Sequence, residues 1–210
     1  MVSIIIPTLF KCPLLYESLK NYQSSLTDDD ELILIDNANS SHNYQSERIR
    51  HLKYSENNFV NKSWNIGAEI AKNDVLVIAN DDIFFNCICY KKNILPFLNS
   101  DTPVGLIGFD IRNLTLPSKK NCFNNDSDSL KFVLTSGRAK GFGMLMALKK
   151  YNYHQIPNEL KIYCGDDYLF LKNKNNYISS GLHSVGYTSY SSKQFDSKLA
   201  QEKHSLQTYL

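Results

Sequence analysis

Short apolar runs alternate with amphipathic segments through the first half of the chain. The expected strands are residues 2–6, 31–36, 51–56, 74–80 and 104–110, of which 51–56 is the weakest. The segments between them carry apolar residues at helical spacing and predict helices at 14–26, 61–72 and from 86 to a stop at Pro96. This alternation predicts an α/β fold with a central, mainly parallel sheet flanked by helices.

The second half of the chain is less regular. Residues 112–130 are rich in Asn, Ser and Asp and predict a loop. Strands are expected at 130–136, 141–148 and 177–182, and a helix at 165–175. The last twenty residues are polar and weakly helical, which fits either a closing helix or the start of a neighbouring domain. No repeat or linker interrupts the pattern, so we expect one domain over residues 1–210.

Composition and charge exclude several classes of protein. The formal net charge is +2 and no dense stripe of Lys or Arg is present, which argues against nucleic-acid binding. The five cysteines form no CxxC pair, so we interpret them as buried reduced thiols. The first apolar run is too short for a signal peptide, and no window reaches the length of a transmembrane helix. We expect a soluble cytoplasmic protein, with attachment to the cytoplasmic face of a membrane left open.

Polar residues follow three of the first four expected strands. Pro7 and Thr8 end the first, Asp36 ends the second, and Asn80, Asp81 and Asp82 end the fourth. Turn chemistry or helix capping accounts for a single acid at such a place. Two adjacent carboxylates repel each other, however, and they are the ligands that Mg²⁺ or Mn²⁺ prefers. On this motif alone the structural and the metal-binding interpretation stay equally open.

Asp166 and Asp167 form a second acidic pair, at the expected start of the helix at 165–175. Acids in the first helical turn are favoured by the helix dipole, which would account for one of them. Alternatively, one carboxylate of the pair is a general base that takes a proton from an attacking hydroxyl. The first acidic pair would then hold metal and phosphate, and the second would activate a nucleophile.

Six segments in order resemble the GT-A glycosyltransferases, and most closely glycosyltransferase family 2 and its rhamnosyltransferase-like relatives. These segments are VSIIIPT, LILIDNANS, NNFVNKSWNIGAEIA, VLVIANDD, GFGMLMALKK and GDDYLFL, and they span roughly residues 2 to 190. The resemblance implies a nucleotide-binding half at about 1–110, an acceptor-side half at about 111–190 and a tail at 191–210. It also implies a UDP-sugar or dTDP-sugar donor, with Mn²⁺ or Mg²⁺ on its diphosphate.

The same resemblance assigns roles to individual residues. It places Pro7 and Thr8 at the nucleoside, Asp36 at the base, and Asn65 and Gly67 along the nucleotide and sugar. Asn80, Asp81 and Asp82 match the DxD motif, with Asp82 as the metal ligand, Asp81 as a second candidate and Asn80 in place of the first acid. His183 matches a histidine that helps to bind metal or diphosphate. Asp166 and Asp167 match the catalytic acid pair, whose second member is the base.

The resemblance therefore implies an inverting glycosyltransferase that acts in glycan synthesis on a glycan or glycoconjugate acceptor. Two alternatives keep the same kind of fold: a non-catalytic module that binds nucleotide sugars or glycans, and a sugar nucleotidyltransferase. A nucleotidyltransferase would carry a glycine-rich basic loop after the first strand, and PTLFKCP contains no glycine. We expect acceptor specificity to lie in residues 112–140 and the tail.

Overall fold

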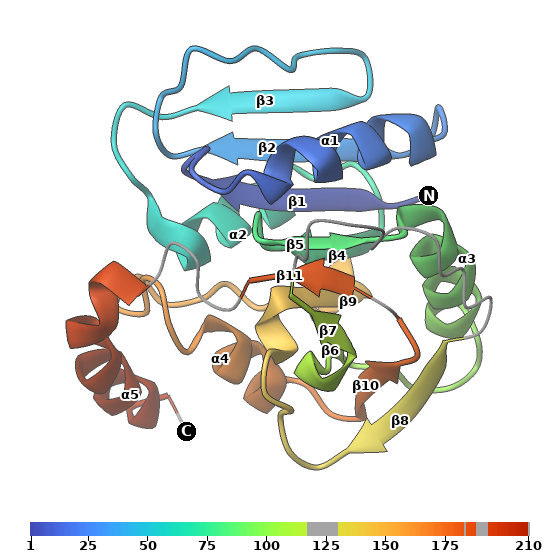
Figure 1. The fold of residues 1–210 in the computed structure, drawn as a ribbon. Coiled ribbons are helices and arrows are strands. Elements are labelled where there is room, and N and C mark those ends of the chain that lie inside the picture. Colours follow the sequence, from blue (N-terminus) through green and yellow to red (C-terminus); the bar gives the residue numbers. More distant parts are fainter. Residues whose placement is uncertain (117–129, 183, 188–192, 210) are drawn as a thin grey trace.

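The computed structural model describes residues 1–116, 130–182, 184–187 and 193–209, and an eight-stranded sheet crosses its centre (Figure 1). The strand order is β3-β2-β1-β4-β9-β6-β10-β8. The bounds are β1 (Ser3–Thr8), β2 (Glu31–Asp36), β3 (Ile49–Lys53), β4 (Val75–Ala79), β6 (Ile107–Phe109), β8 (Lys131–Thr135), β9 (Leu145–Lys149) and β10 (Asn176–Ser180). Four of the seven pairings are parallel, and β8 and β9 run against their neighbours. The predicted α/β class with a mainly parallel sheet is confirmed.

Both faces of the sheet are buried, which explains why the central strands are almost continuously apolar. Along β1, Ile4 and Ile6 belong to the core on one face, and Ile5 belongs to the core on the other. The first core is covered by α1 (Leu14–Ser25) and α3 (Cys87–Leu98). The second is covered by α2 (Phe59–Ile70) and α4 (Gly165–Lys172). Trp64 of α2 is 3% exposed within this second core, as expected of a packing residue.

A second, three-stranded sheet has the order β5-β11-β7. Its strands are β5 (Ile83–Phe85), β7 (Leu114–Thr115) and β11 (Ser184–Gly186). The sequence pattern does not predict them, because two or three residues are too few to show an alternation. This small sheet begins directly after Asp82, so it anchors the end of the motif that follows β4.

Several predicted elements differ from the structure in their bounds, and two of these differences have a clear physical reason. The helix expected to stop at Pro96 continues to Leu98, because the proline lies in its last turn and removes only one N–H group. The strand expected at 141–148 begins only at Leu145, after a turn of 3-10 helix at Phe142–Met144. That turn follows Gly141, whose positive φ of 79° ends the extended backbone.

The remaining elements are short or lie near the C-terminus. They are the 3-10 turns at Ile111–Asn113 and Lys150–Asn152, the 3-10 helix at Lys193–Lys198, and α5 (Leu199–Gln207). The tail therefore contains a short helix. Cys12, Cys87, Cys89 and Cys164 are buried free thiols, as expected, and Cys122 lies outside the described residues, as does most of the predicted loop at 112–130. No helix of the described part of the chain is long and apolar enough to cross a membrane.

Candidate donor-binding and catalytic site

The carboxyl ends of β1 and β4 meet through a hydrogen bond between side chains. The two strands are parallel neighbours, and Thr8 Oγ1 donates to Asp81 Oδ2 over 2.7 Å. The same Oγ1 accepts from the Phe10 N–H over 2.8 Å, which orients the hydroxyl toward the carboxylate. Asp81 is 9% exposed, and burial raises the pKa of its carboxyl group although Thr8 opposes the shift. The polar residues that follow β1 and β4 therefore lie in contact with each other.

A hollow that is partly open to solvent lies beside this contact. It is lined by Pro7, Thr8, Leu9, Asn37, Asn57, Phe59, Val60, Asp81, Ile162 and Phe195. Apolar side chains dominate, while Thr8, Asp81 and two asparagines supply polar atoms. A mostly apolar hollow with a few fixed polar groups is the usual form of a site for a small ligand.

Phe59 at the edge of this hollow is held in an unusual conformation. Its φ of 59° lies in a region that bulky residues rarely adopt, at a cost of about 1–3 kcal/mol. The ammonium groups of Lys161 and Lys198 lie 5.7 and 5.4 Å from its ring centroid, and Phe195 packs edge-on at 5.7 Å. Sequence reasoning missed Phe59, since a strained φ leaves no trace in a hydrophobic pattern. The hollow thus combines an aromatic wall with two nearby positive charges.

The acids after β4 offer a donor set suited to a hard cation. Asp82 is 5% exposed, and its backbone carbonyl accepts from the Tyr187 N–H, beyond the end of β11. The Oδ1 atom of Asn80 is buried and accepts no hydrogen bond from the described residues. Two carboxylates and an amide oxygen fit Mg²⁺ or Mn²⁺ when phosphate oxygens complete the shell. The described residues contain no group of three His, Cys, Asp or Glu side chains that could hold a metal.

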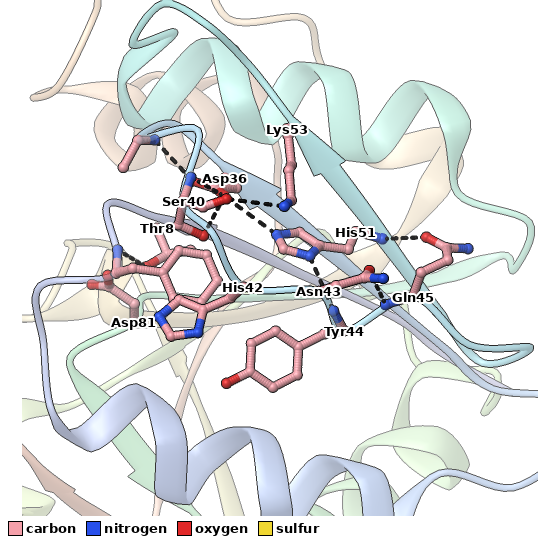
Figure 2. Close-up of polar contacts among 12 residues, drawn as sticks. Thr8, Asp36, Ser40, His42, Asn43, Tyr44, Gln45, His51, Lys53 and Asp81 are labelled. Carbon is pink, nitrogen blue, oxygen red and sulfur yellow. Dashed lines mark hydrogen bonds and ion pairs between the residues drawn. The ribbon is translucent and has the colours of Figure 1, made fainter.

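Asp36 is placed at the end of β2 but is fully occupied by its own loop (Figure 2). Its Oδ1 accepts from the Ala38 N–H over 2.9 Å, and its Oδ2 accepts from both the N–H and the hydroxyl of Ser40. His51 Nε2 lies 3.4 Å from Oδ2, and both side chains are completely buried. Burial acts to raise the pKa of Asp36, but the bonds from Ser40 and Ala38 outweigh it and lower the pKa. Asp36 therefore shapes the loop after β2.

Asn65 and Gly67 are not brought to this hollow. Asn65 donates to the Ile156 carbonyl over 2.8 Å and accepts from the Tyr153 hydroxyl and the Ile156 N–H. A Cβ atom on Gly67 would lie 2.4 Å from Ile5 Cγ2, so this glycine allows α2 to approach β1 closely. Neither residue is among those that line the hollow. The structure gives both positions a packing role.

Asp166 and Asp167 share one cation, which sequence reasoning missed. Arg138 donates from Nη1 to Asp166 Oδ2 and from Nε to Asp167 Oδ1, each over 2.5 Å. The side chains of Asp166 and Asp167 are 16% and 29% exposed. Burial raises the pKa of Asp166, while Arg138 acts against the shift. A lone arginine in SGRAKGFG gives no sequence signal, because the pairing joins positions 28 and 29 residues apart.

The turn that precedes β9 contacts the segments that carry the two acidic pairs. Strand β9 runs antiparallel to β4, which brings this turn to the carboxyl end of β4. The Asn80 N–H donates to the Met144 carbonyl over 3.0 Å. A Cβ atom on the adjacent Gly143 would lie 2.7 Å from the carboxyl carbon of Asp166. The turn at residues 142–144 therefore contacts both Asn80 at the end of β4 and Asp166 in the first turn of α4.

Two of the histidines, His42 and His51, lie near the end of β2. His51 is buried beside Asp36, and its Nδ1 accepts from the Tyr44 N–H over 3.2 Å (Figure 2). His42 stacks on Phe10 with ring centroids 4.9 Å apart, and its Nε2 lies 3.1 Å from the Tyr16 hydroxyl oxygen. His183, the candidate for metal or diphosphate binding, lies outside the described residues.

Solved structures of other proteins share this fold, and three of them illustrate the likeness. The chain matches S. aureus TarS residues 1–349 in complex with UDP-GlcNAc at 12% identity and a TM-score of 0.62. It matches GalNAc-T7 with UDP, GalNAc and Mn²⁺ at 11% identity and a TM-score of 0.65. It matches the mannosyltransferase PcManGT from Pyrobaculum calidifontis, in complex with GDP-Man and Mn²⁺, at 16% identity and a TM-score of 0.56.

The matches cover most of this chain but only part of each neighbour. They include 89%, 91% and 84% of this chain, and 58%, 44% and 56% of the TarS, GalNAc-T7 and PcManGT chains. The chain thus spans less than two thirds of the neighbours' own length. At these identities the likeness establishes the GT-A fold.

A sequence comparison identifies the family directly. A search among curated proteins finds none that matches the chain. The sequence model of glycosyl transferase family 2 matches residues 3–172, which include the strand-end acids, the hollow's β1 and α2 walls, and the Asp166–Asp167 pair. The chain therefore belongs to glycosyl transferase family 2.

Proposed function

We propose that this chain transfers a glycosyl group, with inversion, from a nucleoside-diphosphate sugar to an acceptor hydroxyl in glycan synthesis. One juxtaposition supports this function above all: Asn80, the first residue of the motif after β4, and Asp166 of α4 contact the same turn at residues 142–144. A group that carries a diphosphate and a group that accepts a proton must be close for glycosyl transfer. The neighbours' complexes with UDP-GlcNAc and GDP-Man support a nucleotide sugar as the donor.

In this proposal the hollow takes the nucleoside part of the donor. Pro7 and Thr8 contact the nucleoside, and the ring of Phe59 provides a flat apolar wall. Lys161 and Lys198 place positive charge beside that wall, which favours a ligand that bears phosphates. Asp36 acts indirectly, because its oxygens hold the loop that follows β2. UDP and dTDP sugars are the proposed donors.

The diphosphate lies against the acids that follow β4. Asp82 and Asp81 would hold Mn²⁺ or Mg²⁺ there, and that cation would offset the charge that develops on the leaving diphosphate. Asn80 contributes a buried amide oxygen at the same place. The hydrogen bond from Thr8 fixes one oxygen of Asp81, so the orientation of this carboxylate is set before the donor binds.

Asp167 is the proposed base. Its Oδ1 accepts from Arg138, while its Oδ2 accepts no hydrogen bond from the described residues. Oδ2 can therefore take the proton of the acceptor hydroxyl as the hydroxyl oxygen attacks the anomeric carbon. Attack opposite the departing diphosphate inverts the anomeric configuration in one displacement. Asp166, the more buried acid, keeps Arg138 in position.

Asp167→Asn tests this assignment. The amide keeps the size of the side chain but cannot accept the proton, so we expect transfer to fall by about 10²-fold or more. The affinity for UDP, measured by calorimetry with Mn²⁺, should stay within about twofold of wild type, because the hollow is untouched. Normal turnover with weakened UDP binding would contradict the role of Asp167.

A second experiment, on the wild-type chain, separates the alternative functions. The wild-type chain is incubated with UDP, dTDP and GDP sugars, and free nucleoside diphosphate is measured with and without an acceptor. Donor binding without release in any combination would favour a non-catalytic binding module. Release of pyrophosphate from a nucleoside triphosphate and a sugar phosphate would favour a nucleotidyltransferase.

A further inference from the structure

The loop that leads into the acid pair is held from two opposite sides. On one side, Asn61 of α2 donates from Nδ2 to the carbonyls of Leu160 and Tyr163 over 3.0 and 2.9 Å. Its backbone N–H donates to the Lys161 carbonyl over 3.1 Å. Asn61 is 1% exposed and belongs to the region matched by the family. The carbonyls of the loop are therefore held by a residue that lies in the region matched by the family.

On the other side, the loop's N–H groups are bound by a carboxylate from the tail. Glu202 of α5 accepts from the Ile162 N–H at 3.2 and 3.1 Å from its two oxygens, and from the Tyr163 N–H over 2.8 Å. Its residue is 3% exposed. No Lys, Arg or His nitrogen of the described residues lies within 4.0 Å of it to form an ion pair. Burying a carboxylate without a cation costs free energy. A residue that served only to dock α5 would therefore not need to be an acid.

The position of Asp166 and Asp167 depends on this loop. Tyr163 is followed by Cys164, which turns the chain with a φ of 60°, and then by Gly165, the first residue of α4. A Cβ atom on Gly165 would lie 2.2 Å from Asn61 Oδ1, so the loop has little room to move toward α2. Asp166 and Asp167 follow directly in the first helical turn. A shift of the Ile162 and Tyr163 amides would thus move both carboxylates.

The tail also reaches the other half of the site. Phe195 lines the hollow beside Thr8 and Asp81, and Lys198 lies over the ring of Phe59. At the far end of α5, the Tyr209 hydroxyl donates to Glu159 and the Tyr209 carbonyl accepts from Lys172 of α4. The tail therefore contacts the hollow, the loop and α4, although the family match ends at residue 172.

We infer that Glu202 is a positioning residue that sets the place of Asp166 and Asp167 through the amides of Ile162 and Tyr163. The segment 193–209 is accordingly part of the transfer site in this chain. This inference rests on the proposed function for its catalytic consequence, whereas its structural part, the fixing of the loop by Glu202, does not.

The test compares Glu202→Leu and Glu202→Gln with Gln201→Ala, an exposed neighbour on the same helix. Leucine fills the volume but accepts no hydrogen bond, whereas glutamine keeps one accepting oxygen. We expect amide hydrogen exchange at Ile162, Tyr163 and the first turn of α4 to become about tenfold faster in Glu202→Leu. The rate of transfer should fall by about 10- to 100-fold, with the affinity for UDP within about twofold of wild type. Glu202→Gln should be intermediate in both measurements, and Gln201→Ala should match wild type.

Folded Glu202→Leu with wild-type turnover and wild-type exchange over residues 160–168 would overturn the inference. If that variant does not fold, wild-type values of both quantities in Glu202→Gln would overturn it instead. A wild-type chain that neither binds a nucleoside diphosphate nor transfers a sugar would refute the proposed function alone. The exchange data would then still decide whether Glu202 fixes the loop.

Discussion

Replacing Arg138 with methionine removes the only cation that pairs with both acids of α4 among the described residues. Each acid loses a charge-assisted hydrogen bond of 2.5 Å. Two such bonds are worth about 1.5–3 kcal/mol each, and the 32% exposure of the arginine side chain reduces this through screening by water. We therefore expect the free energy of unfolding to fall by about 2 kcal/mol in Arg138→Met. For a chain of this size, that loss corresponds to a drop in Tm of about 4–8 °C.

The loss of unfolding free energy in Arg138→Met should depend on pH in a defined direction. Burial raises the folded-state pKa of Asp166 above its ordinary value of 3.8, so the folded protein binds more protons and the contribution of this group to stability falls as pH rises. Arg138 opposes that shift, and its removal raises the pKa further. The difference between wild type and variant should be largest near neutral pH and should shrink as the pH falls through the folded-state pKa of Asp166, because a protonated Asp166 no longer needs the cation.

Urea unfolding across this pH range measures the effect, with Arg112→Met as the matched control. Arg112 also makes a two-point contact, with Asp110, but its side chain is 84% exposed, so its loss should matter far less. An Arg138→Met variant as stable as wild type at neutral pH, or one whose loss grows on acidification, would refute the reasoning.

Three further outcomes are expected. Gly67→Ala should lower the free energy of unfolding by about 1–2 kcal/mol in urea titrations, because its Cβ would lie 2.4 Å from Ile5, whereas Gly137→Ala has open space and should change little. Burial outweighs the attraction of Asp36 and lowers the pKa of His51, so wild-type stability should fall as pH drops below about 6.5, and urea unfolding of His51→Gln should lose that slope. Asp82→Ala should abolish the Mn²⁺-dependent part of UDP binding in calorimetry, and an unchanged Mn²⁺ dependence would contradict the assignment of Asp82 to the metal.

The candidate site was predictable where its residues follow buried strands. Thr8 and Asp81 end neighbouring parallel strands, and their apolar runs are visible in the sequence as strands covered on both faces. The acidic start of α4 was predictable for a similar reason, because a helix and its first turn are local features. Each of these predictions needs only a short window of sequence.

Residues that act through contacts distant in sequence were not predictable. Asp36 matches a motif, but its oxygens are taken up by Ala38 and Ser40, and only the folded loop reveals this. Arg138 and Glu202 each sit in polar segments with no periodic signal, and their partners lie 28 to 40 residues away. Such a contact depends on where two elements pack, which no local pattern specifies.

The sequence by itself determined the order along the chain of the longer helices and of the strands of the large sheet, the two-sided burial of that sheet, the acids at the strand ends and the family. These follow from residue spacing and from burial of apolar side chains, which act over a few residues at a time. Only the tertiary structure decided that the segments carrying the two acidic pairs contact the turn at residues 142–144, that Arg138 bridges the second pair, and that the tail closes on the site. The physical reason is that these contacts join separate elements, and only their packing against the sheet brings the side chains within reach of one another.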